Sequence, residues 1–271
     1  MSAFAMANNS KNRYFQLIED IFFNRYKKGD VRVEFIREDI EDAAVQLNIK
    51  LPKNLGDIIY SFKFRTALPE KIKKTADDGK EWVIKNIGRA QYAFEQLTNS
   101  RILPDDMLMA TKIPDATPGI VERYALEDEQ SLLAKLRYNR LLDIFTGVTC
   151  YSLQNHLRTT VPGVGQVETD EIYVGVDKLG RQYVFPVQAK GGKDEIGIVQ
   201  IEQDILLCSH KYPSLICRAI AAQFLGSNRI VIFEFTVQDG EIRKKTERHY
   251  HLVLQSEITS EELAAYNQLV D

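Results

Sequence analysis

Two alternating runs joined by a short glycine-containing loop constrain the fold of this chain more than any other feature. The runs cover residues 166–176 and 182–189, and the loop between them is Asp177-Lys-Leu-Gly-Arg. Alternation of apolar and polar residues is typical of β-strands, and a loop of this length joins two strands as an antiparallel hairpin. We therefore expect a β-hairpin here, with side chains alternating between its two faces.

Four polar side chains lie on this hairpin where alternation can bring them together. Glu168 and Asp170 share one face of the first strand, while Gln188 and Lys190 share one face of the second. Paired strands lie about 5 Å apart. The second strand is otherwise apolar, and a buried Gln and Lys without partners would cost several kcal/mol. We expect the four groups to form a polar site; the alternative is a structural hairpin with coincidental polar ends.

The segments around the hairpin predict an α/β or α+β domain with a central mixed sheet flanked by helices. Helical patterns cover residues 127–160, as one or two helices, then 193–208 and 212–225. Closing strands are expected over 229–235 and 248–254. Helices before and after a run of strands favour a layered architecture with the sheet in the middle.

The N-terminal part is predicted to be mainly helical. Amphipathic patterns indicate helices over residues 13–24 and 37–47, and a third helix opens at Asn54. Basic residues and a strand-like run at 81–85 follow, which is the outline of a winged helix-turn-helix. A small helical subdomain with a solvated charged face is the alternative.

A proline-rich connector separates the two parts of the chain. Three of the eight prolines, Pro104, Pro114 and Pro118, lie in a stretch without sustained periodicity. The predicted domains are therefore a helical, possible winged-helix recognition domain over residues 1–120 and a second domain over residues 121–271.

Composition narrows the functional classes. A net charge of −3 argues against a protein that coats nucleic acid through a generally basic surface, although a locally basic cleft is compatible with it. The three cysteines include no Cys-x-x-Cys pair, so neither a zinc ribbon nor a disulfide framework is expected. No apolar stretch reaches the roughly 18 residues of a membrane span, and the start lacks a leader pattern. We expect a cytoplasmic protein without a membrane partner.

The hairpin residues resemble the signature of the PD-(D/E)xK nuclease superfamily, which has the restriction-endonuclease-like fold. In that signature an acidic residue on one strand, here Asp170, precedes a carboxylate-x-Lys pair on the next. The pair here is Gln188-Ala-Lys190, in which Gln replaces the carboxylate; this Gln-x-Lys form is similar to that of the Mrr-type nucleases. Gln188 follows Asp170 by 188 − 170 = 18 residues. Glu129, at the start of the preceding helix, matches an additional acid that such helices often supply.

The resemblance implies a Mg²⁺-dependent DNA endonuclease, similar to type II restriction enzymes. Asp170 is the expected main metal ligand, with Glu168, Glu171 and Gln188 as further or alternative ligands to one or two ions. Carboxylate and amide oxygens suit Mg²⁺, and a neutral oxygen binds it less strongly. The metal would activate water, and Lys190 would offset charge developing on the phosphate. Double-stranded DNA is the implied partner and a homodimer the implied assembly.

Three basic residues are expected to contact DNA. Lys63 and Arg65 follow the predicted helix pair, and Lys193 follows the Gly-Gly that ends the second strand of the hairpin. The alternative function is a non-catalytic winged-helix DNA-binding regulator. Both classes of protein would bind DNA with a steep salt dependence, but only the nuclease would need Mg²⁺ and Lys190.

Overall fold

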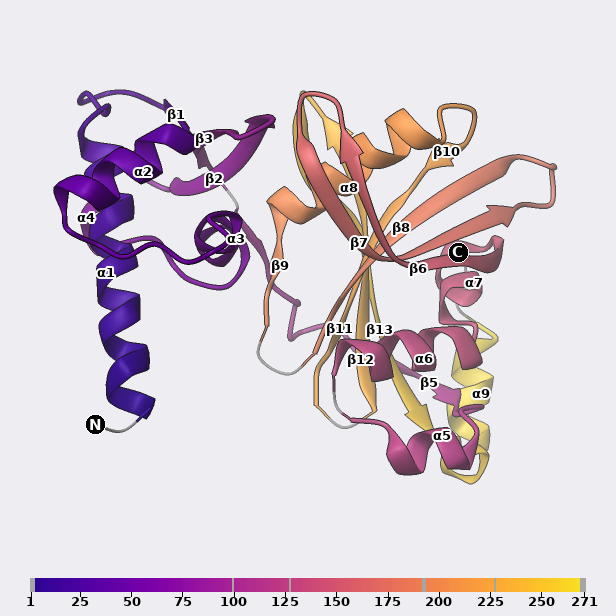
Figure 1. The fold of residues 1–271 in the computed structure, drawn as a ribbon. Helices are drawn as coiled ribbons and strands as arrows, with labels where there is room; N and C mark the ends of the chain where they lie inside the picture. Colours follow the sequence, from indigo (N-terminus) through magenta and orange to yellow (C-terminus); the bar gives the residue numbers. More distant parts are fainter. Residues whose placement is uncertain (1–2, 99, 127, 192–193, 227, 269–271) are drawn as a thin grey trace. The chain divides into compact units, whose positions relative to one another are not determined.

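The computed structural model divides into two compact units, which are described separately below (Figure 1). The described residues are 3–98, 100–126, 128–191, 194–226 and 228–268. Unit 1 covers residues 1–101 with 160–166, and unit 2 covers 102–159 with 167–271. The division after Arg101 precedes the predicted boundary at residue 120, because part of the expected connector forms a strand of the unit 2 sheet.

Unit 1 combines helices with a small antiparallel sheet. Its elements in chain order are α1 (Ala3–Phe23), β1 (Arg32–Ile36), α2 (Arg37–Gln46), α3 (Gly56–Phe64), α4 (Glu70–Lys73), β2 (Glu81–Gly88) and β3 (Gln91–Leu97). The strand order is β1-β3-β2, so the first strand pairs with the last. Helices α2 and α3 correspond to the predicted helix pair, and the short α4 separates them from the β2–β3 ribbon.

Aromatic side chains from the helices and the sheet form the unit 1 core. Phe22 of α1 is fully buried, and its ring lies 5.1 Å from each of the rings of Trp82 and Phe94 in edge-to-face contact. Ring pairs in this geometry add about 0.5–1.5 kcal/mol beyond the burial of their area. Helix α1 is therefore held against the sheet by specific packing.

Unit 2 is built around an eight-stranded mixed sheet. Its helices are α5 (Gly119–Tyr124), α6 (Glu129–Tyr138), α7 (Leu141–Thr146), α8 (Ile198–Lys211) and α9 (Ser260–Tyr266), with a 3₁₀ turn at Gln255–Glu257. Its strands are β5 (Ala110–Pro114), β6 (Thr149–Val161), β7 (Gly165–Val176), β8 (Gln182–Lys190), β9 (Ile196–Gly197), β10 (Ile216–Cys217), β11 (Ala219–Phe224), β12 (Arg229–Gln238) and β13 (Glu241–Val253). The short β4 (Arg101–Ile102) lies where the two units join in the chain. The coarse prediction of a mixed α/β class is confirmed.

The predicted hairpin is a central part of the large sheet. The strand order of this sheet is β5-β13-β12-β11-β8-β7-β6, and β10 also pairs with β8. Strands β7 and β8 are antiparallel, with Glu171 opposite Val187 and Tyr173 opposite Phe185. On its other side β8 runs parallel to β11. Residues on both faces of β8 are buried, which explains why this strand is nearly continuously apolar.

The two faces of β8 are covered by different helices. Val187 and Ala189 belong to one core cluster with leucines of α6 and α7. Gln188 points to the other face, where its amide reaches Asp204 of α8. The alternation of this one strand therefore directs its polar residue toward α8 and its apolar neighbours toward α6.

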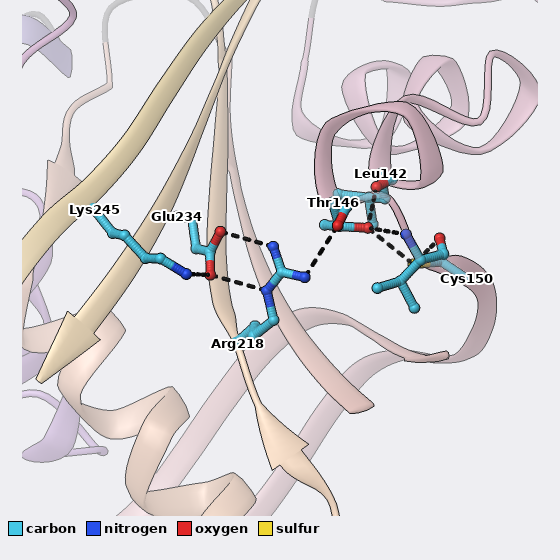
Figure 2. Close-up of polar contacts among 7 residues, drawn as sticks. Leu142, Thr146, Cys150, Arg218, Glu234 and Lys245 are labelled. Atoms are coloured by element: carbon cyan, nitrogen blue, oxygen red, sulfur yellow. Dashed lines mark hydrogen bonds and ion pairs between the residues drawn. The ribbon is translucent and has the colours of Figure 1, made fainter. Parts of the chain in front are cut away.

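A largely buried ion pair near the start of β11 connects Arg218 with Glu234 of β12, as Figure 2 shows. The Arg218 guanidinium donates to both carboxylate oxygens of Glu234 at 2.9 and 2.8 Å and to the Thr146 carbonyl at 3.1 Å. Lys245 lies 3.0 Å from the same carboxylate. Burial opposes ionisation of Glu234, but these cations hold its pKa below the ordinary value. Both oxygens of the carboxylate thus have partners, which is typical of a structural pair.

Among the helices of the described residues, none combines the length and the apolar character needed to cross a membrane.

Candidate functional site

Lys190, the last residue of β8, meets Glu129 at the start of α6. Its Nζ donates to Glu129 Oε1 at 2.9 Å, and the two side chains are 13% and 38% exposed. Asp128 caps the helix by accepting from the Ser131 amide at 2.9 Å, so the position of Glu129 is set by the helix start. The structure therefore brings together two residues that are 61 positions apart in the chain.

Asp170 lies beside the same strand end. Its Oδ2 accepts a hydrogen bond from the Ala189 amide at 2.8 Å, directly before Lys190. Burial raises the pKa of Asp170, while the Ala189 amide and the charge of Lys190 act in the opposite direction. The negative charge of Glu129 adds to the increase in pKa. Asp170, Lys190 and Glu129 thus form one electrostatic group.

Gln188 joins the group to Asp204, a residue that was not predicted from the sequence. Its Nε2 donates to Asp204 Oδ2 at 2.9 Å and to the Glu168 carbonyl at 3.3 Å. Thr169 donates its hydroxyl hydrogen to the other oxygen of Asp204. The fully buried Asp204 carboxyl is therefore held by donors from both strands of the hairpin.

The environment of Asp204 strongly disfavours its charge. Burial raises the pKa of Asp204 to about 7, although the hydrogen bonds from Thr169 and Gln188 lower it. The nearby negative charge of Asp170 raises it further. Two carboxyls that oppose each other's ionisation in a partly dry site are a common feature of functional centres.

Asp204 had a signal in the sequence. It lies in α8 at helical spacing from Ile201 and Leu207, which face the interior, so an acid occurs on the apolar side of an amphipathic helix. A buried carboxyl of this kind needs hydrogen-bond partners. The helix and the strand that carries Gln188 were both predicted, but the packing of one on the other was not, and the acid was therefore not connected with Gln188.

The other two candidate acids make different contacts. The carboxylate of Glu168 pairs with Arg158 at 2.7 Å near the surface. Glu171 is fully buried, contacts the Ser152 hydroxyl and lies 3.4 Å from Arg137. Burial raises the pKa of Glu171. Because Glu171 follows Asp170 directly, strand alternation points it to the opposite face, and its contacts differ from those expected of an alternative metal ligand.

The donor set is compatible with a hard cation. In residues 3–98, 100–126, 128–191, 194–226 and 228–268 there is no group of three His, Cys, Asp or Glu side chains arranged to bind a metal. Asp170 and Asp204 are nevertheless close enough to raise each other's cost of ionisation, and Gln188 adds an amide. Oxygen donors suit Mg²⁺, and a cation would relieve the repulsion of the two carboxylates.

Two of the three predicted DNA contacts lie on α3 and its end in unit 1. Lys63 Nζ lies 4.9 Å from the centre of the Phe64 ring and 3.4 Å from Asn86 Oδ1. Arg65 is exposed, and its guanidinium lies 5.0 Å from the centre of the Tyr60 ring. The third residue, Lys193, is outside the described residues.

Comparison of the chain with family models, with curated proteins and with solved structures gave no match. The functional assignment therefore depends on the chemistry of the contacts themselves. Those contacts bring together the carboxyls of Asp170, Asp204 and Glu129, the amide of Gln188 and the ammonium group of Lys190 around the end of β8.

Proposed function

We propose that this chain is a Mg²⁺-dependent endonuclease that hydrolyses phosphodiester bonds in double-stranded DNA, similar to type II restriction enzymes and acting in the cytoplasm. One observation carries the proposal. Lys190 Nζ lies 2.9 Å from Glu129 Oε1, while Asp170 accepts from the adjacent Ala189 amide at 2.8 Å. An ammonium and a carboxylate held side by side at a strand end are the groups that cleavage of a phosphodiester requires.

Each residue of the group has a distinct role in this proposal. Lys190 orients the attacking water and offsets negative charge that develops on the phosphate. Glu129 holds the ammonium in place through the 2.9 Å contact. Gln188 fixes Asp204 through the hydrogen bond at 2.9 Å, so the second carboxyl stays beside the first.

Asp170 would hold Mg²⁺, with oxygens of Asp204 and Gln188 as the remaining protein donors. When bound, Mg²⁺ makes a coordinated water more acidic and stabilises charge on the phosphate. The raised pKa values of Asp170 and Asp204 are consistent with this role, because burial and mutual repulsion penalise their charges when no cation is present.

Unit 1 is the proposed recognition part. Its helices α2 and α3 followed by the β2–β3 ribbon agree with a winged helix-turn-helix, in which one helix enters a DNA groove. Lys63 and Arg65 supply positive charge at the end of α3. Cleavage of both strands of a duplex favours two-fold symmetry, so a homodimer is the proposed assembly.

A non-catalytic DNA-binding regulator is the second candidate. The topology of unit 1 favours it as much as it favours the nuclease, because a winged helix binds DNA without cleaving it. The pairing of Lys190 with Glu129 favours the nuclease, since a regulator has no need of this group at the end of a strand.

The test is a cleavage assay on purified protein. Supercoiled plasmid and phage DNA are incubated with the protein in Mg²⁺ or in chelator, and the products are separated on agarose. The proposal predicts nicked or linear plasmid in Mg²⁺ and intact plasmid in chelator. DNA binding measured by a gel shift, with no cleavage in Mg²⁺, would favour the regulator.

A further inference from the structure

His156, on strand β6, has an unusual backbone conformation for its position. Six non-glycine residues among those the structure describes have a positive φ, and five of them lie in turns. His156 has φ +47° and is the one that lies within a strand. Residues held in this region within regular structure are uncommon, and such conformations cluster at functional sites.

The ring of His156 reaches the start of α6. Its Nε2 lies 2.9 Å from Gln130 Nε2, and Gln130 directly follows Glu129, the partner of Lys190. An amide can turn either its oxygen or its NH₂ group toward the ring. The contact is therefore compatible with both the neutral and the protonated imidazole.

The ring is also electrostatically connected with the hairpin acids. Its positive charge, when present, acts to lower the pKa of Asp170 and the pKa of Glu171. The side chain is exposed, and in the part of the chain that the structure describes its Nδ1 has no hydrogen-bond partner. This nitrogen is therefore available to a bound substrate.

The proposed nuclease reaction lacks a proton donor among the residues considered so far. Lys190 is engaged with Glu129, and Asp170 and Asp204 are the proposed Mg²⁺ ligands, which bind the ion as carboxylates without a proton. Imidazole transfers protons readily near neutral pH. A histidine beside the site, on an element separate from the acids, is chemically suited to this missing role.

We propose that His156 is a catalytic residue that donates a proton to the oxygen leaving the phosphate, an inference that rests on the proposed nuclease function. Water attacks phosphorus and forms the new P–O bond, and the released water proton passes to solvent. The bond between phosphorus and the leaving oxygen breaks with its electron pair remaining on oxygen. That oxygen takes a proton from the imidazolium ring of His156, which becomes neutral imidazole and then takes up a proton from solvent.

The test uses His156→Asn, because asparagine adopts a positive φ readily but cannot act as the acid. The control is His210→Asn, which changes an exposed histidine at the end of α8. After the cleavage position of the wild-type chain has been mapped, a second duplex is made with sulfur in place of the oxygen that cleavage releases. A thiolate leaves without needing a proton, so this substrate bypasses the acid.

His156→Asn should cleave the ordinary duplex about 10²-fold more slowly or worse and the sulfur duplex at nearly the wild-type rate, while His210→Asn cleaves both normally. His156→Gly, which relieves the backbone conformation, should show the same selective loss. An equal loss on both substrates, or no loss, would overturn the role of His156 and leave the nuclease assignment intact. Absence of cleavage by the wild-type chain would overturn both proposals.

Discussion

Gln188 donates a 2.9 Å hydrogen bond to Asp204, so an amide from the centre of the sheet and a fully buried carboxyl from α8 are direct partners. The strand places Gln188 on the α8 face, and the helix turns Asp204 toward it. Thr169 contacts the second oxygen of the same carboxyl. The network therefore links both strands of the hairpin to the helix that covers them.

The first prediction concerns the pH dependence of stability. The pKa of Asp204 is raised from 3.8 to about 7 in the folded protein, which therefore retains a proton that the unfolded chain releases between these values. The stability associated with this proton is full below pH 3.8 and is lost as the pH rises through 7. Relative to Asp204→Asn, the wild-type free energy of unfolding should fall by up to about 1.4 kcal/mol per pH unit in this window.

Urea unfolding in chelator between pH 4.5 and 8 measures this difference. Asp106→Asn is the control, because Asp106 is exposed. Its curve should run parallel to that of the wild type. If the Asp204→Asn curve is also parallel, the carboxyl does not retain its proton in the folded state.

The second prediction separates two substitutions of Gln188. Gln188→Glu places a second carboxyl against Asp204, so it should retain Mg²⁺-dependent cleavage and bind the ion more tightly above pH 7. Gln188→Leu removes a hydrogen-bond donor from a buried carboxyl, which should lower the free energy of unfolding by about 1–3 kcal/mol. It also removes a proposed ligand, so cleavage should need a higher concentration of Mg²⁺. Titrations of cleavage rate with Mg²⁺ compare the two. Identical curves for both variants would place Gln188 outside the site.

The third prediction concerns the ion pair in Figure 2. Glu234→Gln leaves Arg218 largely buried without its carboxylate, and should lower the free energy of unfolding by about 3 kcal/mol or more. Lys245 is 54% exposed, so Lys245→Ala should cost less than about 1 kcal/mol. Urea unfolding at neutral pH measures both. An equal loss of unfolding free energy in the two variants would contradict the conclusion that the Arg218–Glu234 pair stabilises the sheet more than Lys245 does.

The fourth prediction concerns the DNA surface. Replacing Lys63, Arg65 and Lys193 by Ala should reduce the slope of log K against log salt by about one for each phosphate that the variant no longer binds. Lys71→Ala is the control, because this exposed lysine pairs with Glu19. Binding of a DNA duplex is measured by fluorescence anisotropy at several salt concentrations. A slope unchanged in the triple variant would show that these three residues do not face DNA.

The hairpin could be predicted from the sequence because its information is local. Alternation sets the faces, and the loop sets the pairing, so β7 and β8 begin and end within one residue of the predicted runs. The contact between Lys190 and Glu129 is less local, but the helix start at Asp128 placed the acid at a definite position. These features depend mainly on residues close in the chain.

Elements determined by distant packing were predicted less well. The helix expected over residues 212–225 is wrong, because this segment forms β10 and β11. Its alanines favour a helix by propensity, yet β11 lies between β8 and β12 and is buried by them. The second half of the helical region predicted over 127–160 is likewise strand β6. Neighbouring strands that supply the hydrogen bonds decide such cases.

The same limit applied to the site. Strand parity separates Glu171 from Asp170 but does not say which face meets α6 and which meets α8. Asp204 enters only because α8 packs across β8 with one particular rotation. No local pattern encodes that rotation, so the pairing of Asp204 with Gln188 could be recognised only in the folded chain.

In the proposed reaction Lys190 and Asp170 act directly in phosphodiester hydrolysis. The single-turnover cleavage rates of Lys190→Ala and Asp170→Ala in Mg²⁺ test this proposal. Lys112→Ala is the matched control, because this lysine pairs with Glu262. We expect each of the two substitutions to lower the rate by about 10³-fold or more, with DNA binding retained, or tighter for Asp170→Ala because a negative charge is removed. The control should cleave normally. A Lys190→Ala protein that cleaves DNA at the wild-type rate would contradict the nuclease assignment.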